Sequence, residues 1–281
     1  MPISRKRIEI IVIAVLIVGI IGYAGAGLVV SGLRVAGAER TLNTVVSHQN
    51  TLNTTFSDIN TQLSALSSSS AFNPQQAIVL VDKSVSNSEL ATKTINADDA
   101  SLVAASSQLG SLRWLTMVGH GSLDRETSRL GHARAALVAA RTIASDEAAD
   151  GHFWHSLYLS LAELTTLNSQ VGGGDLAAAQ TTLAAMKSDI AAAAALSTSP
   201  GLPSELHALM TDLSAFAADV GKQLDAQIAG DDASVAVYEA TVQADQAKIS
   251  AYDIDKIGTE ITAFYKPLID QFNKEITAAT S

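Results

Sequence analysis

Residues 153–197 read FWHSLYLSLAELTTLNSQVGGGDLAAAQTTLAAMKSDIAAAAALS, and this stretch decides the fold class. Its apolar side chains recur every three or four residues, which predicts a helix from Phe153 to about Ser169. Glycines 172–174 end that helix, and Asp175 is a typical N-cap for the next one. The stretch therefore predicts an antiparallel helical hairpin.

Residues 204–250 predict a second hairpin of the same design. Gly230 and Asp231 repeat Gly174 and Asp175 at an offset of 56 residues. This agreement indicates either a duplicated unit or two hairpins that converged on one pattern. The same offset aligns Phe153 with Leu209, Trp154 with Met210, Leu157 with Leu213, and Leu164 with Val220.

The rest of residues 73–281 also shows helical spacing, so we expect one helical bundle domain over this range. Asn73 and Pro74 predict the start of one helix. A later helix is expected to end near Asp150 and Gly151, just before the first hairpin. The last helix is expected to follow Gly230 and Asp231, to run past Phe272, and to kink at Pro267. No segment shows a strand pattern, and the predicted class is all-α.

Residues 31–72 predict one amphipathic helix ahead of this domain. A seam that packs on the protein's own later helices is favoured, because the flanking positions lack the regular charges of coiled-coil partners. The alternative is a homo-oligomer formed through residues 42–66. The seam consists of Leu42, Val45, Gln49, Leu52, Phe56, Ile59, Leu63 and Leu66.

Residues 10–30, IIVIAVLIVGIIGYAGAGLVV, contain no charged side chain. A helix of this length spans roughly 30 Å, the thickness of the hydrocarbon core of a bilayer. Arg5, Lys6 and Arg7 precede it, so the positive-inside rule places residues 1–9 in the cytoplasm and the later chain outside. We therefore expect a single-pass transmembrane signal-anchor helix followed by an extracytoplasmic bundle of antiparallel hairpins.

A cleaved secretory signal is the alternative for the same segment. Its basic start, apolar centre and small residues Ala24, Gly25 and Ala26 fit that pattern, and cleavage near Ala26 would release a secreted protein. Retention is favoured because the apolar run continues through Leu28 and Val30.

Composition excludes several function classes. The formal net charge of −10 argues against nucleic acid as a partner. The absence of cysteine excludes disulfides, thiolate metal sites and thiol catalysis. The sequence contains no Gly-rich phosphate loop, zinc-protease motif or nucleophile elbow, so we predict that the protein is not an enzyme and needs no cofactor.

The densest group of titratable residues is Asp146, Glu147, Asp150, His152 and His155. On one helix, His152 and His155 would lie on the same side, where both imidazoles could bind a metal ion with a nearby carboxylate. Further ligands would have to come from His120, His132 or Glu163. The competing interpretation places these acids and histidines at a helix start, where negative charge suits the helix dipole.

These patterns favour a membrane-anchored, non-enzymatic helical module that binds a protein or another component of the cell envelope. The first alternative is an extracytoplasmic sensor or ligand-binding domain that acts through a separate transmitter protein. The second alternative is a metal-binding protein that uses His152 and His155.

Overall fold

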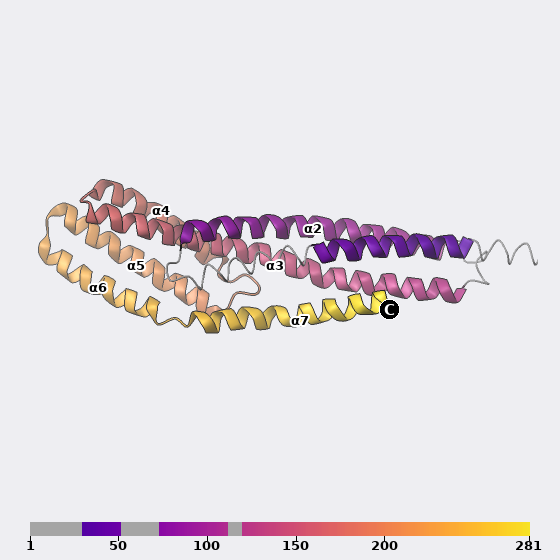
Figure 1. The fold of residues 1–281 in the computed structure, drawn as a ribbon. Coiled ribbons are helices and arrows are strands. Elements are labelled where there is room, and N and C mark those ends of the chain that lie inside the picture. The colour runs from indigo at the N-terminus through magenta and orange to yellow at the C-terminus, as the bar shows by residue number, and fades with distance from the viewer. Residues whose placement is uncertain (1–29, 52–72, 112–119) are drawn as a thin grey trace, which may run out of the picture. The chain divides into compact units, whose positions relative to one another are not determined.

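The structure is a computed structural model that describes residues 30–51, 73–111 and 120–281. Every regular element in these ranges is an α-helix, and none of them contains a strand. The predicted all-α class is confirmed for this part of the chain. The helices comprise residues 30–51, α2 (Pro74–Gly110), α3 (His120–Gly172), α4 (Leu176–Leu196), α5 (Ser204–Ala229), α6 (Asp232–Ser250) and α7 (Ile254–Thr280), all drawn in Figure 1.

The predicted transmembrane segment, residues 10–30, lies outside the described residues except for Val30. Among the helices that the structure does describe, none combines the length and the apolar character that crossing a bilayer would require.

The described residues group into two compact units. Unit 1 comprises the described parts of Met1–Thr51, Thr94–Ala140 and Asp270–Ser281. Unit 2 comprises the described parts of Leu52–Lys93 and Arg141–Ile269. Helices α2, α3 and α7 each contribute residues to both units.

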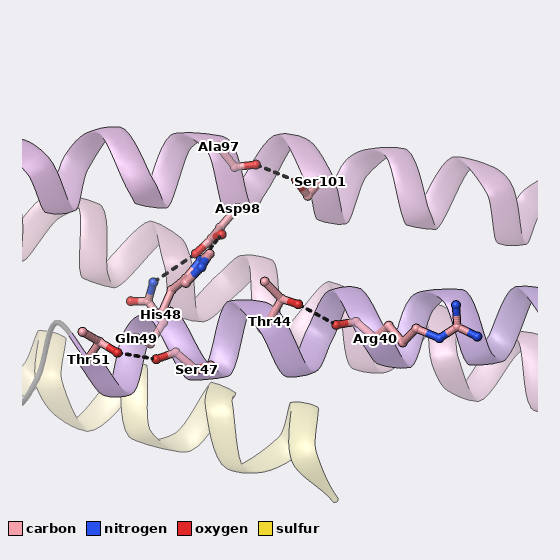
Figure 2. A network of polar contacts seen from close by, with 9 residues as sticks. All are labelled: Arg40, Thr44, Ser47, His48, Gln49, Thr51, Ala97, Asp98 and Ser101. Carbon is pink, nitrogen blue, oxygen red and sulfur yellow. Dashed lines mark hydrogen bonds and ion pairs between the residues drawn. The ribbon is translucent and has the colours of Figure 1, made fainter.

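In unit 1, the helix over residues 30–51 buries the start of the predicted seam. Leu42 and Val45 are buried, and so is the polar seam residue Gln49. Gln49 Nε2 donates a hydrogen bond to Asp98 Oδ2 at 3.4 Å, and His48 Nδ1 lies 2.9 Å from Asp98 Oδ1 (Figure 2). The described part of the seam thus packs within its own chain. Leu52, Phe56, Ile59, Leu63 and Leu66 lie outside the described residues.

Hydroxyl side chains in the helices bond to their own backbone. Thr44 Oγ1 donates to the Arg40 carbonyl at 3.0 Å, and Ser101 Oγ donates to the Ala97 carbonyl at 2.9 Å (Figure 2). Each bond joins a residue to the carbonyl four positions earlier, which satisfies the hydroxyl without a tertiary partner. A sequence rich in serine and threonine can form long helices in this way.

Unit 2 contains the residues of both predicted hairpins. Helix α5 packs on α6 within the second hairpin, and α4 of the first hairpin packs on α5 of the second. One continuous apolar core includes buried side chains from the second half of α3 and from all three of these helices. Its largest fully buried members are Phe153, Leu167, Met186, Ile190, Leu206 and Met210.

The two hairpin turns have matching hydrogen bonds. Gly174 and Gly230 adopt positive φ angles of 79° and 67°. Asp175 N donates to the Gln170 carbonyl at 2.9 Å, and Asp231 N donates to the Ala226 carbonyl at 3.0 Å. Each aspartate carboxylate then accepts a bond of 3.1 Å from the backbone three residues later. The turns agree at the predicted offset of 56, while the duplication of whole hairpins stays a prediction.

The predicted helix end at Asp150 and Gly151 is wrong, because α3 continues through both residues. Gly151 is buried inside the helix, where α2 approaches closely. A Cβ atom on Gly151 would lie 2.4 Å from Val85 Cγ2, so this glycine makes room for Val85. A glycine required for packing cannot be distinguished from a helix stop by local pattern alone.

The single predicted last helix is also wrong, since it divides into α6 and α7 at residues 251–253. Asp253 caps the start of α7, where its Oδ1 accepts a bond of 2.9 Å from Lys256 N. Helix α7 continues through Pro267, which lies inside it. The apolar spacing across the break concealed the capping signal at Asp253.

We predict that Gly151→Ala lowers the free energy of unfolding by about 1 to 3 kcal/mol, because the new methyl group overlaps Val85. Gly131→Ala in the same helix is the matched control. A Cβ there meets nothing within 4 Å, and alanine should stabilise the helix by roughly 0.5 to 1 kcal/mol. Urea unfolding measures both effects. Equal changes in the two variants would contradict the close contact.

Candidate functional site

Three carboxyl groups lie together in the middle of α3. Asp146, Glu147 and Asp150 are spaced so that they share one side of the helix, and we call them the acidic cluster. Asp150 is only 7% exposed. Because α3 extends from His120 to Gly172, the interpretation of these residues as a helix start is wrong.

Tyr265 on α7 contacts the acidic cluster directly. Its hydroxyl donates a buried hydrogen bond of 2.7 Å to Asp150 Oδ2. The two residues are 115 positions apart, and no local pattern marks Tyr265 as a partner of Asp150. Sequence reasoning therefore missed this residue.

Gly201 closes the turn between α4 and α5 over the same pair. Its φ angle of 94° is strained for any residue with a side chain. A Cβ at Gly201 would lie 2.8 Å from Tyr265 Oη and 3.0 Å from Asp150 Oδ2. Pro200 and Pro203 flank Gly201 in this turn, and its contact with the cluster was not predicted from the sequence.

Burial changes the acidity of the cluster. It raises the pKa of Glu147 to about 7, with a further increase from the charge of Asp150. It raises the pKa of Asp150 to about 6, where the Tyr265 hydrogen bond lowers the value and the charge of Asp146 raises it. Burial also raises the pKa of Asp146. The cluster therefore changes its charge near neutral pH.

Several buried oxygen atoms of this region have no hydrogen-bond partner among the described residues. They are Glu147 Oε2, Asp150 Oδ1 and the Ser88 hydroxyl on α2. The Ser88 side chain lies near Glu147, without regular hydrogen-bond geometry, and slightly lowers the pKa of Glu147. An ionised carboxylate in such surroundings costs free energy, whereas a protonated carboxyl group costs much less.

The predicted metal ligands His152 and His155 both lie on α3. His152 is exposed, and His155 Nδ1 lies 2.6 Å from Asp82 Oδ1 on α2. Within the described ranges, no three histidine, aspartate or glutamate residues form a group that could hold a metal ion. A weaker site formed by the two histidines alone stays a prediction.

The other proposed ligands have nearby partners of their own. His120 lies 2.5 Å from Asp124, and His132 lies 2.7 Å from Glu275. Glu163 faces Asp189 on α4, and burial together with the charge of Asp189 raises the pKa of Glu163. The structure does not bring these groups to His152 and His155.

Helices α4 and α5 also enclose a surface cavity of about 360 Å³. Its lining contains no residue of the acidic cluster and no predicted metal ligand. Lys222, at this cavity, is paired with Asp219 at 2.5 Å. The cavity therefore does not add to the chemistry of the cluster.

Comparison with known proteins adds no assignment, since no family model, curated protein or solved structure matches the chain. The role of the acidic cluster is inferred from its own contacts, burial and charge.

We predict that stability falls as the pH rises from about 5 to about 8. Between the ordinary pKa values of these acids and their raised values, the folded chain binds more protons than the unfolded chain, so rising pH favours unfolding. Glu147→Gln removes one such proton site. It should raise the free energy of unfolding at pH 8 by on the order of 2 kcal/mol and change it little at pH 4.

Glu205→Gln is the control with the opposite sign. The bond from Lys256 lowers the pKa of Glu205, so its ionised form stabilises the folded chain at neutral pH and this contribution is lost on acidification. The Glu205→Gln substitution should therefore lower the free energy of unfolding at pH 7. Denaturant midpoints measured at several pH values test both variants, and a Glu147→Gln midpoint that follows the wild type at every pH would refute the assignment.

Proposed function

We propose that this protein is a membrane-anchored, non-enzymatic helical module that binds a protein or another component of the cell envelope. The observation that carries the proposal is the uncharged segment 10–30 after Arg5, Lys6 and Arg7. The described residues open with a helix over residues 30–51, which would carry the chain away from the bilayer. The charge bias favours a cytoplasmic N-terminus and an extracytoplasmic bundle.

Binding is supported by the kind of surface that long helices offer. Val79 and Leu90 are 67% and 58% exposed on α2. They are 11 residues apart, which is about three helical turns, so they lie on the same side of the helix. Exposed apolar side chains on one helix face can contact a partner protein.

A sensor that acts through a separate transmitter protein is the second candidate. The acidic cluster favours it, because buried carboxyl groups that titrate near neutral pH respond to their surroundings. The ligand in this case would be the proton.

We predict that replacing Ile20 and Ile21 with arginine releases the protein from membranes. Each arginine at the centre of a transmembrane helix costs roughly 2.5 to 3.5 kcal/mol. Leu33→Arg is the matched control, since Leu33 lies beyond the segment and is 69% exposed. Wild type and control should stay in carbonate-washed membranes, and the double variant should not. Release of the wild type would refute the anchor, unless its mature N-terminus begins near Gly27 and shows cleavage.

Protease added to sealed cells tests the orientation. Digestion of the bundle in intact cells supports the extracytoplasmic location, whereas protection until lysis contradicts it. A photocrosslinker at Leu90 then tests the binding proposal: a discrete protein adduct in intact membranes, absent when the crosslinker is placed at buried Leu130, supports a protein partner.

A further inference from the structure

Small side chains leave a cavity between α4 and α5, two helices of unit 2 that lie side by side in Figure 1. Ala184 on α4 and both Ala218 and Gly221 on α5 line it, where larger residues would fill the space. Its volume of about 360 Å³ is within the range of sites that hold small organic molecules. We call this space the α4–α5 cavity.

The floor of the α4–α5 cavity is apolar. Leu183 and Leu224 line it, and both are buried members of the core of unit 2. A Cβ atom on Gly221 would lie 3.4 Å from Leu183 Cδ2, so Leu183 rests against the backbone of α5. An aliphatic group placed on this floor would lose contact with water, and this loss favours binding.

The ammonium group of Lys187 lies over the same floor. A Cβ atom on Gly221 would be 2.7 Å from Lys187 Nζ, which places the charged end of this lysine on the backbone of α5. Within the described part of the chain, Lys187 forms no ion pair or hydrogen bond. Its positive charge is therefore available to an anion in the cavity.

The other charged residues of the lining already have partners. Lys222 Nζ lies 2.5 Å from Asp219 Oδ1, and the charge of Asp245 on α6 also acts on Lys222. Asp225 Oδ1 accepts a hydrogen bond of 3.1 Å from Gln180 Nε2. Lys187 is thus the group that selects the charge of a ligand.

We propose that the α4–α5 cavity binds a small monocarboxylate with an aliphatic body. The carboxylate pairs with Lys187 Nζ, and the aliphatic body covers Leu183 and the backbone at Gly221. Ala184 and Ala218 form the walls that leave room for it. The binding requires neither the membrane anchor nor a protein partner, so it can be true or false independently of the proposed function.

The charges around the cavity favour one negative charge over several. A single available ammonium group can offset a single carboxylate. A doubly charged phosphate would have no second available cation and would also face the carboxylate of Asp225 in the lining. A cationic ligand would meet the ammonium groups of both Lys187 and Lys222.

Titration of the full chain with hexanoate tests the proposal. The chain is labelled with ¹⁵N-glycine and held in zwitterionic detergent micelles, and the amide signal of Gly221 is followed by NMR. Hexanoate should shift this signal with a Kd of roughly 1 to 10 mM. Acetate, which lacks the apolar body, should bind at least about tenfold more weakly. Hexylammonium has the opposite charge and should leave the signal in place.

Two outcomes of this titration would overturn the proposal. One is a Gly221 signal that does not respond saturably to hexanoate. The other is an equal response to hexylammonium, which would show that the cavity takes apolar chains without regard to charge.

A lysine variant tests the ion pair. Lys187→Gln should weaken hexanoate binding about fivefold. Its matched control is Lys83→Gln, which removes the same charge from an exposed position on α2 and should leave the affinity unchanged. Equal weakening in the two variants would show a general effect of net charge and would refute the role of Lys187.

An alanine variant tests the location. Ala218→Leu fills the cavity and should abolish the response to hexanoate. Its matched control is Ala185→Leu, an exposed position on α4 outside the lining, which should bind hexanoate as the wild type does. Both alanines are exposed, so neither change disturbs the core, and equal melting temperatures of the two variants verify this. Hexanoate binding that survives Ala218→Leu would place the site elsewhere and overturn the proposal.

Discussion

Close approach of helices through small side chains is the constraint on which this structure depends. Aromatic residues make up only 5% of the chain, so large side chains cannot fill wide gaps between helices. Buried alanines occur in most of the described helices, and Gly151 lets Val85 of α2 lie against the backbone of α3. Helices this close also bury the short polar residues between the alanines, which explains why Ser88 and Asp150 are inside.

The buried acids fall into two chemical classes. Asp98 in unit 1 faces His48 and Gln49, so its charge has donors on a neighbouring helix. Asp150 in unit 2 accepts a hydrogen bond from Tyr265, while burial and the charge of Asp146 raise its pKa. The first arrangement stabilises a fixed contact. The second arrangement makes the stability of the fold depend on pH. A pH sensor requires this dependence, whereas a simple structural contact does not require it.

Local features of the fold could be predicted from the sequence, and distant contacts could not. The turn at Gly174 and Asp175 was correct because its capping and glycine signals lie within a few residues. Gly151 misled the prediction, since glycine serves equally in a turn and in a close helix contact. The acids and histidines of α3 were recognised as the densest titratable group. Their partner Tyr265 was missed, because a separation of 115 residues leaves no periodic signal.

The sensor candidate depends on the compartment in which the bundle lies. A cytoplasmic protein is held near a constant pH, so carboxyl groups that titrate between about 6 and 7 would rarely change state there. A bundle outside the membrane would meet the varying pH of its surroundings. If the anchor directs the chain outward, the acidic cluster is exposed to that variation, as the sensor candidate requires. If the chain faces inward, the same cluster mainly weakens the fold, because its buried carboxyl groups are then mostly held at one pH.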